Sequence, residues 1–190
     1  MIERLRERLN SWLFKLGSAA AKTGLSGTAW SVISLLFSIL SALFYAQSYS
    51  IYGGFLLLAS GFLDVVDGSV ARATGKASSR GAFIDSTLDR LAEILVFTGL
   101  MVGRVGEPPI ILLALAFSLL VSYVRARGEA EGLRIAGIGV GERGERLPSL
   151  ALFSIAGYPY YGVLTVLTLA SVTVIQRVHY ALTSQVLRKD

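Results

Sequence analysis

The stretch 63-LDVVDGSVARATGKASSRGAFIDSTLDR-90 places four aspartates between two apolar segments. They are Asp64, Asp67, Asp85 and Asp89, and the stretch holds no other carboxylate. The flanking residues are apolar enough to lie in a membrane, where acidic side chains are costly unless a cation offsets their charge. The pattern therefore predicts a membrane protein with a cation-binding site at the edge of the bilayer.

The composition of the whole chain is that of an integral membrane protein. Of its 190 residues, 53% are hydrophobic and 16% are charged, whereas soluble domains carry about 25% charged residues. The mean hydropathy is +0.61. The chain has no cysteine and one histidine, which excludes disulfides, thiolate metal sites and a multi-histidine zinc site. The net charge of +5 indicates membrane orientation and anionic ligands, and we expect no nucleic-acid partner.

Hydropathy predicts an all-α, polytopic fold with six transmembrane helices. The apolar runs are 30–46, 52–72, 82–102, 109–124 and 147–178, and the last is broken into two helices at residues 157–159, the first of them short. Residues 2–22 repeat apolar side chains every three or four positions against a basic face, which predicts an amphipathic interfacial helix. We expect 1–190 to form a single domain, with a juxtamembrane segment at 1–24 and a six-helix bundle at 27–187.

The lysines and arginines predict the orientation of these helices. In this topology the N-terminal helix, the 73–80 turn, the 125–146 loop and Arg188-Lys189 lie on one side and hold nearly all the cations. The opposite turns hold one, Arg104. Because basic loops stay in the cytosol, we expect a multi-pass protein of the cell membrane with both termini and the aspartates at the cytosolic side.

The spacing of the aspartates predicts two tiers of facing carboxylates. Asp64 and Asp67 are three residues apart and Asp85 and Asp89 are four apart, so each pair shares a helix face. Counting outward from a turn near Ala77 sets Asp64 level with Asp89 and Asp67 level with Asp85. Hard cations such as Mg²⁺ and Mn²⁺ prefer such oxygen ligands and complete their shell with phosphate. Two divalent ions would balance the four charges.

Small residues accompany the aspartates and leave room for a bulky ligand. Gly61, Gly68 and Ala71 follow the Asp64 face, and Gly81 precedes Asp85 by one turn. Arg72 lies one turn beyond Gly68, where its guanidinium could hold a phosphate. The 74–81 turn, which includes Ser78, suits phosphate or ribose contacts.

The sequence Asp-x2-Asp-Gly-x2-Ala-Arg-x8-Gly-x3-Asp-x3-Asp at 64–89 resembles the motif of the CDP-alcohol phosphotransferase family at every fixed position. The resemblance implies six transmembrane helices, a homodimer and two metal ions. It also implies an enzyme in which an acceptor hydroxyl attacks the lipid-side phosphorus of a CDP-linked lipid and CMP leaves. It implies that Asp64, Asp67, Asp85 and Asp89 are metal ligands and that Asp89 is also the general base. Residues implied to bind the CDP-lipid are Gly68, Ala71 and Arg72, and we add Ser78 and Gly81 from their positions.

The stretch 122-SYVRARGEAEGLRIAGIGVGERGERL-147 and Arg177 contain the arginines that could choose the acceptor. Convergent arginines favour a phosphorylated acceptor. However, four glutamates in the same stretch could pair with them, and a headgroup-binding patch or orientation alone would also account for the charge.

Three segments resemble the phosphatidylinositol phosphate synthase branch of the family: RARGEAEGLR, GERGERL and the QRVH at 176–179. The resemblance implies that Arg125, Arg146 and Arg177 hold inositol phosphate. Arg125 stands where bacterial members usually have lysine, and 25–28 lacks their Thr-Pro pair, which suggests an archaeal counterpart. The donor is then CDP-diacylglycerol or CDP-archaeol.

Two other functions compete with this interpretation. The same chemistry with glycerol 3-phosphate would give phosphatidylglycerol phosphate, and its pocket would also be anion-binding. A cation transporter would use the acids as a permeation site, but it would not need Arg72 or Gly68. We interpret His179 and Glu93 as supporting residues and not as catalytic ones.

Overall fold

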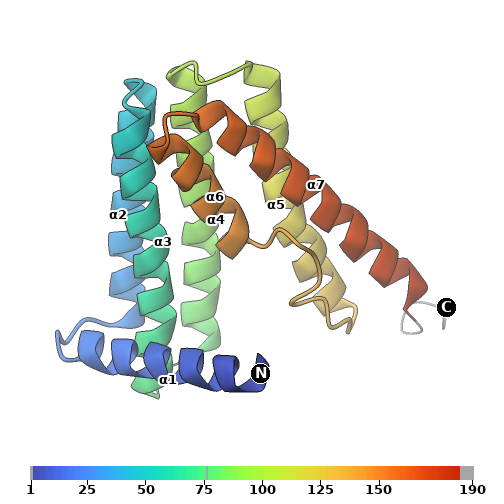
Figure 1. The fold of residues 1–190 in the computed structure, drawn as a ribbon. Coiled ribbons are helices and arrows are strands. Elements are labelled where there is room, and N and C mark those ends of the chain that lie inside the picture. Colours follow the sequence, from blue (N-terminus) through green and yellow to red (C-terminus); the bar gives the residue numbers. More distant parts are fainter. Residues whose placement is uncertain (1, 76, 185–190) are drawn as a thin grey trace.

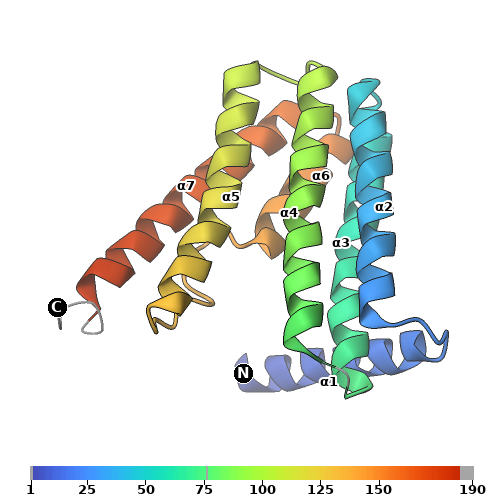
Figure 2. The ribbon, with the colours of Figure 1, turned by 180° about the vertical axis from the view of Figure 1, so that it is seen from behind.

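The structure is a computed structural model that describes residues 2–75 and 77–184, with side chains from residue 12 onward. The described residues form seven helices: α1 (Ile2–Ala21), α2 (Gly27–Ala46), α3 (Ser50–Ala73), α4 (Ser79–Val102), α5 (Pro108–Ala130), α6 (Arg143–Ile155) and α7 (Pro159–Thr183). In Figure 1, α2, α3 and α4 stand side by side, α1 crosses their lower ends, and α5 and α7 splay away from them. Seen from behind in Figure 2, α4 and α5 lie in front of the short α6.

The helices confirm the all-α prediction and correct two boundaries. Helix α5 continues six residues beyond Val124, because Arg125–Glu129 and Arg127–Glu131 pair along its basic end. Helix α6 begins at Arg143 and not at Leu147, with Glu142 as its N-cap residue. The predicted break is confirmed, since α6 ends at Ile155 and α7 begins at Pro159. The end of the predicted bundle at 187 and the Arg188-Lys189 pair lie outside the described residues.

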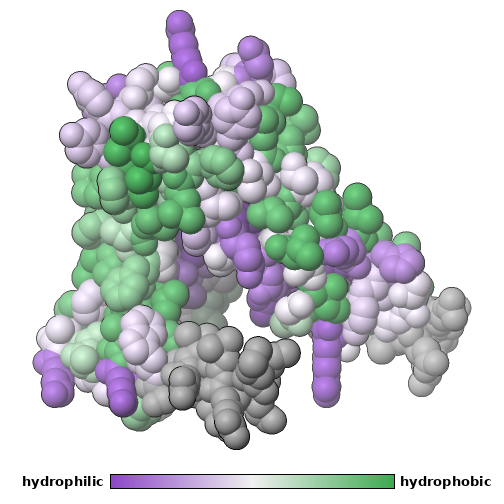
Figure 3. Space-filling model, in the orientation of Figure 1, coloured by the Kyte–Doolittle hydropathy of each residue, from purple (hydrophilic) through white to green (hydrophobic). Residues whose placement is uncertain are grey.

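Four of the described helices are long and apolar enough to cross a membrane: α2, α3, α5 and α7. Helix α4 has the length but carries the charges of the site, and α6 has only 13 residues, or about 20 Å. Figure 3 shows apolar side chains over much of one face of the molecule and polar side chains in a recess within that face. The protein is therefore a helical membrane protein. The helix predicted at 2–22 is present as α1, but the side chains of 2–11 that would define its faces lie outside the described part.

A seam of serines joins α2 to α3 and leads to the site. Ser34 donates to the Ser60 carbonyl at 2.9 Å, Ser38 lies 2.7 Å from the Ser60 hydroxyl, and Ser41 donates to the Gly53 carbonyl at 2.8 Å. Small hydrogen-bonding residues let helix backbones approach closely in an apolar medium. Ser31 continues this face at the lower end of α2, where it reaches the carboxylates.

Apolar side chains from six helices, α2 to α7, form the core above the site. Tyr45, Leu57, Phe97, Ile111 and Leu150 are among its buried members. Gly99 of α4 lies so close to the Ala42 carbonyl of α2 that no side chain fits between them. Helix α6 packs against both α3 and α7. The core therefore holds α6 so that the helix begins partway along the bundle, with its first residue, Arg143, near the aspartates of α3 and α4.

Candidate active site

Three aspartates from two helices form a compact cluster. Asp64, Asp67 and Asp85 each offer one carboxylate oxygen, and these oxygens lie within 4.8 Å of one another. Asp67 is 5% exposed, and its Oδ2 accepts a hydrogen bond of 2.7 Å from the Ser31 hydroxyl. The predicted convergence of α3 and α4 aspartates is thus found in the structure.

Asp89 lies beside this cluster and faces arginines. Its Oδ1 is 2.6 Å from Nη1 of Arg143, and its Oδ2 is 3.3 Å from Nη1 of Arg90. The same Nη1 of Arg143 lies 2.7 Å from Oδ2 of Asp64. The predicted upper tier of Asp64 and Asp89 is therefore bridged by a guanidinium from α6.

The aspartates are a chemically suitable site for hard divalent cations. The donor set is all oxygen, as Mg²⁺ and Mn²⁺ prefer. Oδ1 of Asp85 is buried without a hydrogen-bond partner among the described residues, so it is available as a ligand. A close group of carboxylates in an apolar surrounding also needs a balancing charge. The residues present thus fit the predicted metal ions.

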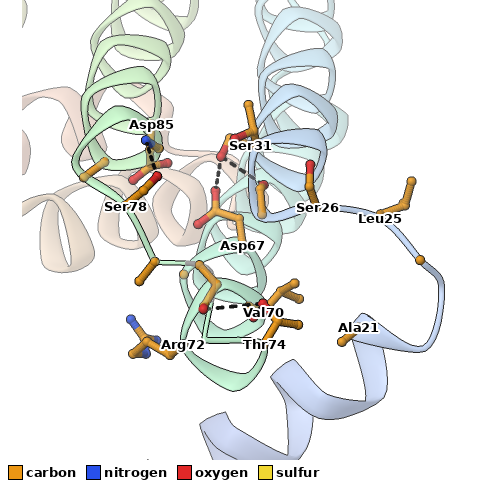
Figure 4. Close-up of a pocket in the computed structure, with 18 residues that line it drawn as sticks. Ala21, Leu25, Ser26, Ser31, Asp67, Val70, Arg72, Thr74, Ser78 and Asp85 are labelled. Carbon is orange, nitrogen blue, oxygen red and sulfur yellow. Dashed lines mark hydrogen bonds between the residues drawn. The ribbon is translucent and has the colours of Figure 1, made fainter.

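A cavity of about 470 Å³ opens on the lower side of the cluster. Its wall combines the start of α2, the end of α3 and the start of α4, and the linker after α1 closes one side (Figure 4). Asp67 and Asp85 lie at its inner end, and Arg72 lies near its opening. The volume is in the range of pockets that hold drug-sized or nucleotide ligands.

The residues predicted to contact the CDP-lipid line this cavity: Gly68, Ala71, Arg72, Ser78 and Gly81. The guanidinium of Arg72 folds over Gly68 and donates to the Ser69 hydroxyl at 3.3 Å. Ser78 is the N-cap of α4, and its hydroxyl accepts from the Gly81 amide at 3.1 Å. A ligand contact by Ser78 would therefore share this oxygen with a structural role.

A second cavity of about 190 Å³ is bordered by Asp89. Arg125, Arg146 and Arg177 line it, as the sequence predicts, and so do Arg90 and Arg143. Several glutamates do pair with these arginines: Glu129 lies 2.9 Å from Arg125, and Glu142 lies 2.7 Å from Arg177. Glu93 pairs with Arg146 and Arg143 at 3.4 and 3.5 Å.

The two predicted arginines at the floor of this second cavity are almost wholly buried. Arg146 is 0% exposed and donates to the carbonyls of Gly141 and Ser118. Arg177 is 2% exposed and donates to the carbonyls of Ile138 and Val121. Both side chains therefore hold the 131–142 loop and the helix ends together while they also border the cavity.

The sequence pattern alone does not identify Arg143 or Ser31 as site residues. Arg143 is 79 residues from Asp64 and Ser31 is 36 residues from Asp67. No periodicity links positions so far apart. The one available signal for Arg143 is that its stretch holds more arginines than orientation requires.

An apolar helix bundle that encloses a carboxylate cluster, a nucleotide-sized cavity and an arginine-lined cavity defines a membrane-embedded enzyme of phosphate chemistry. The sequence pattern of the CDP-alcohol phosphatidyltransferase family matches residues 27–183. The chain belongs to this family, and the protein is accordingly a phosphotransferase.

Two similar relatives are both archaetidylinositol phosphate synthases. The archaetidylinositol phosphate synthase of Pyrococcus horikoshii is 36% identical over 181 residues, which cover 95% of this chain and 96% of the relative. The enzyme of the same name from Aeropyrum pernix is 44% identical over 124 residues, or 62% of each chain.

Solved structures show the same fold. The phosphatidylinositol phosphate synthase of Mycobacterium tuberculosis in complex with manganese and citrate superposes with a TM-score of 0.80 at 25% identity, covering 91% of this chain and 90% of that one. The same enzyme with CDP-DAG bound gives a TM-score of 0.79, covering 91% of this chain and 94% of that one.

Proposed function

We propose that the protein transfers the archaetidyl or phosphatidyl group of a CDP-linked lipid to inositol phosphate and releases CMP. The observation that carries this proposal is the arginine-lined cavity that Asp89 borders, next to a carboxylate cluster whose Asp67 and Asp85 border the nucleotide-sized cavity. A phosphorylated acceptor needs such a cationic pocket. Relatives named archaetidylinositol phosphate synthase support inositol phosphate as the acceptor.

The proposed reaction exchanges one phosphate ester bond for another. The acceptor hydroxyl oxygen bonds to the lipid-side phosphorus, the bond from that phosphorus to the bridging oxygen breaks, and CMP leaves. Asp89 accepts the hydroxyl proton, because it borders the arginine-lined cavity and lies beside Asp64 and Asp85.

The other polar residues bind and orient the two substrates. Arg72, Gly68, Ala71, Ser78 and Gly81 hold the nucleotide, and Arg125, Arg146 and Arg177 hold the acceptor phosphate. Divalent ions held by Asp64, Asp67, Asp85 and Asp89 would offset the charge of the diphosphate and of the leaving CMP.

We further propose the arrangement in the membrane. Residues 1–190 form one domain in which α2 to α7 make a six-helix bundle and α1 lies in the interface. The basic end faces the cytosol, and the protein is a homodimer. Exposed Tyr49, Tyr52, Tyr158 and Tyr161 form ring contacts at the opposite end of the bundle, which supports a membrane boundary there, where aromatic side chains concentrate.

The proposal is tested with purified protein, CDP-archaeol or CDP-diacylglycerol, Mn²⁺ and separate acceptors. We expect CMP release with inositol phosphate and at most a small rate with glycerol 3-phosphate or free inositol. A preference for glycerol 3-phosphate would replace the proposed acceptor. If no acceptor gave CMP release, the proposed function would be wrong.

A further inference from the structure

Arg143 borders both the carboxylates and the arginine-lined cavity, and its own partners are charged side chains. Its Nη1 lies 2.7 Å from Asp64 and 2.6 Å from Asp89, and its Nε lies 3.5 Å from Glu93. Its side chain is 17% exposed. The matched family motif at 64–89 does not include it, and it is not among the residues predicted from the sequence.

The position of Nη1 conflicts with a metal ion shared by Asp64 and Asp89. One nitrogen stands within 2.7 Å of a facing oxygen from each carboxylate. The second oxygen of Asp89 faces Arg90, so neither oxygen of Asp89 is without a guanidinium neighbour. A divalent ion bound to the facing oxygens would therefore compete with the Arg143 guanidinium for the same two atoms. The two positive charges would also repel each other.

The Arg143 guanidinium also has a second possible position, in the arginine-lined cavity. Arg143 is the first residue of α6, so a rotation of its side chain alone can move the charge. The arginine-lined cavity already includes it. In its present place Nε is buried without a hydrogen-bond partner in the described part of the chain, so leaving forfeits no hydrogen bond at that atom.

The neighbouring arginines are less able to move. Arg146 and Arg177 are held by backbone carbonyls, two for each side chain. Breaking those bonds would leave buried carbonyls unpaired, which is costly. Among the described residues, the side-chain partners of Arg143 are instead carboxylates, whose charge a divalent cation can balance in its place.

We propose that Arg143 is an exchangeable counter-cation: a divalent ion takes its place between Asp64 and Asp89, and the released guanidinium binds the acceptor phosphate. Metal binding and acceptor binding then favour each other, since each draws Arg143 in the same direction. The acceptor part of this proposal rests on the proposed function, whereas the competition with metal does not. Arg143 is thus the counter-ion of Asp64 and Asp89 before a divalent ion binds, and a binding residue for the acceptor afterwards.

The proposal is tested by whether the affinity for Mn²⁺ rises or falls when Arg143 is replaced. Substitution of a residue that merely supports a metal ligand lowers the metal affinity about 10- to 100-fold. Arg143→Gln should do the opposite and tighten Mn²⁺ binding by roughly tenfold, because it removes a competing charge. The measurement is a titration of the full-length protein in detergent, with unbound Mn²⁺ read from its electron paramagnetic resonance signal.

A phosphate probe tests the coupling. Inositol phosphate should tighten Mn²⁺ binding to the wild type and have a much smaller effect on Arg143→Gln. Arg127→Gln is the matched control, because Arg127 pairs with Glu131 on the exposed end of α5 outside both cavities, and it should behave as wild type. Equal or weaker Mn²⁺ binding by folded Arg143→Gln would overturn the proposal.

A structural measurement keeps the test decisive if Arg143→Gln does not fold. A crystal structure of the wild type with Mn²⁺ and inositol phosphate should show Arg143 removed from Asp89 and in contact with the phosphate, and an intact Arg143–Asp89 contact beside bound metal would contradict us. Failure of turnover with a positive Mn²⁺ result would count only against the proposed function. Turnover by the wild type with no tightening in Arg143→Gln would count only against this inference.

Discussion

At the scale of single residues, the sequence predicts the aspartates well and their supporting partners poorly. Spacings of three and four residues fix which carboxylates share a helix face, and the short turn between α3 and α4 fixes their depth. Ser31 and Arg143 reach the same atoms from α2 and α6. Their contacts depend on how distant helices pack, which no local pattern records.

Ser31 should orient Asp67 as a metal ligand. Its hydroxyl donates to Oδ2 of Asp67 at 2.7 Å, and both residues are buried. Removal of such an outer partner costs about 10- to 100-fold in metal affinity, so Ser31→Ala should weaken Mn²⁺ binding by roughly tenfold. Ser86→Ala on the exposed face of α4 is the control, because Ser86 bonds only to the carbonyl of Phe83. Wild-type Mn²⁺ affinity in Ser31→Ala would show that the hydrogen bond has no such role.

Asp89→Asn tests the general base. The amide keeps the size of the side chain but cannot accept the acceptor's proton, so turnover should fall about 10²- to 10⁴-fold. Binding of CDP should change little, since Asp89 does not line the nucleotide-sized cavity. Single-turnover CMP release and CDP binding on the same preparation separate the two effects. Turnover close to wild type would assign the proton to another group.

At the scale of helices, hydropathy predicts where the chain enters the bilayer better than where helices end. The apolar run 109–124 stops at the first arginine, but the helix continues to Ala130 through paired charges. Conversely, α6 starts four residues before its apolar run, since Arg143 and Arg146 belong to its first turn and a half. A hydropathy window does not detect a charged helical turn, and here such turns carry Arg125 and Arg146, which we propose to bind the acceptor.

Glycines at helix crossings should differ sharply in their tolerance of a side chain. A Cβ at Gly99 would overlap the Ala42 carbonyl, whereas Gly61 has open space around it. Gly99→Ala should lower the free energy of unfolding by roughly 1–3 kcal/mol through overpacking. Gly61→Ala should be neutral or raise it by about 0.5–1 kcal/mol through helix propensity. Thermal unfolding in one detergent compares the pair, and equal effects would mean that α2 and α4 adjust at their crossing.

At the scale of the whole molecule, the sequence predicts an asymmetric protein, with cations at one end and few at the other. The structure sets α1, the 22–26 linker, the turn before α4 and the 131–142 loop toward one end of the helices (Figure 1). The turns at 47–49, 103–107 and 156–158 lie at the opposite end. What the sequence does not predict is the splay of α5 and α7 from the other helices. That splay follows from the half-length α6, which fills the upper part of the bundle and leaves its lower part to the site.

The membrane orientation proposed for this molecule can be determined by labelling single introduced cysteines, because the chain has no cysteine of its own. Ser79→Cys lies beside the basic turn before α4, and Gln47→Cys lies in the opposite turn after α2; both positions are exposed. Positive loops are retained in the cytosol. A membrane-impermeant maleimide should therefore label Ser79→Cys in inverted vesicles and Gln47→Cys in right-side-out vesicles. Glu107→Cys, in the turn before α5, should behave as Gln47→Cys does. Labelling of Ser79→Cys from the outside would invert the topology and place the carboxylates away from the cytosolic pool of phosphorylated acceptors.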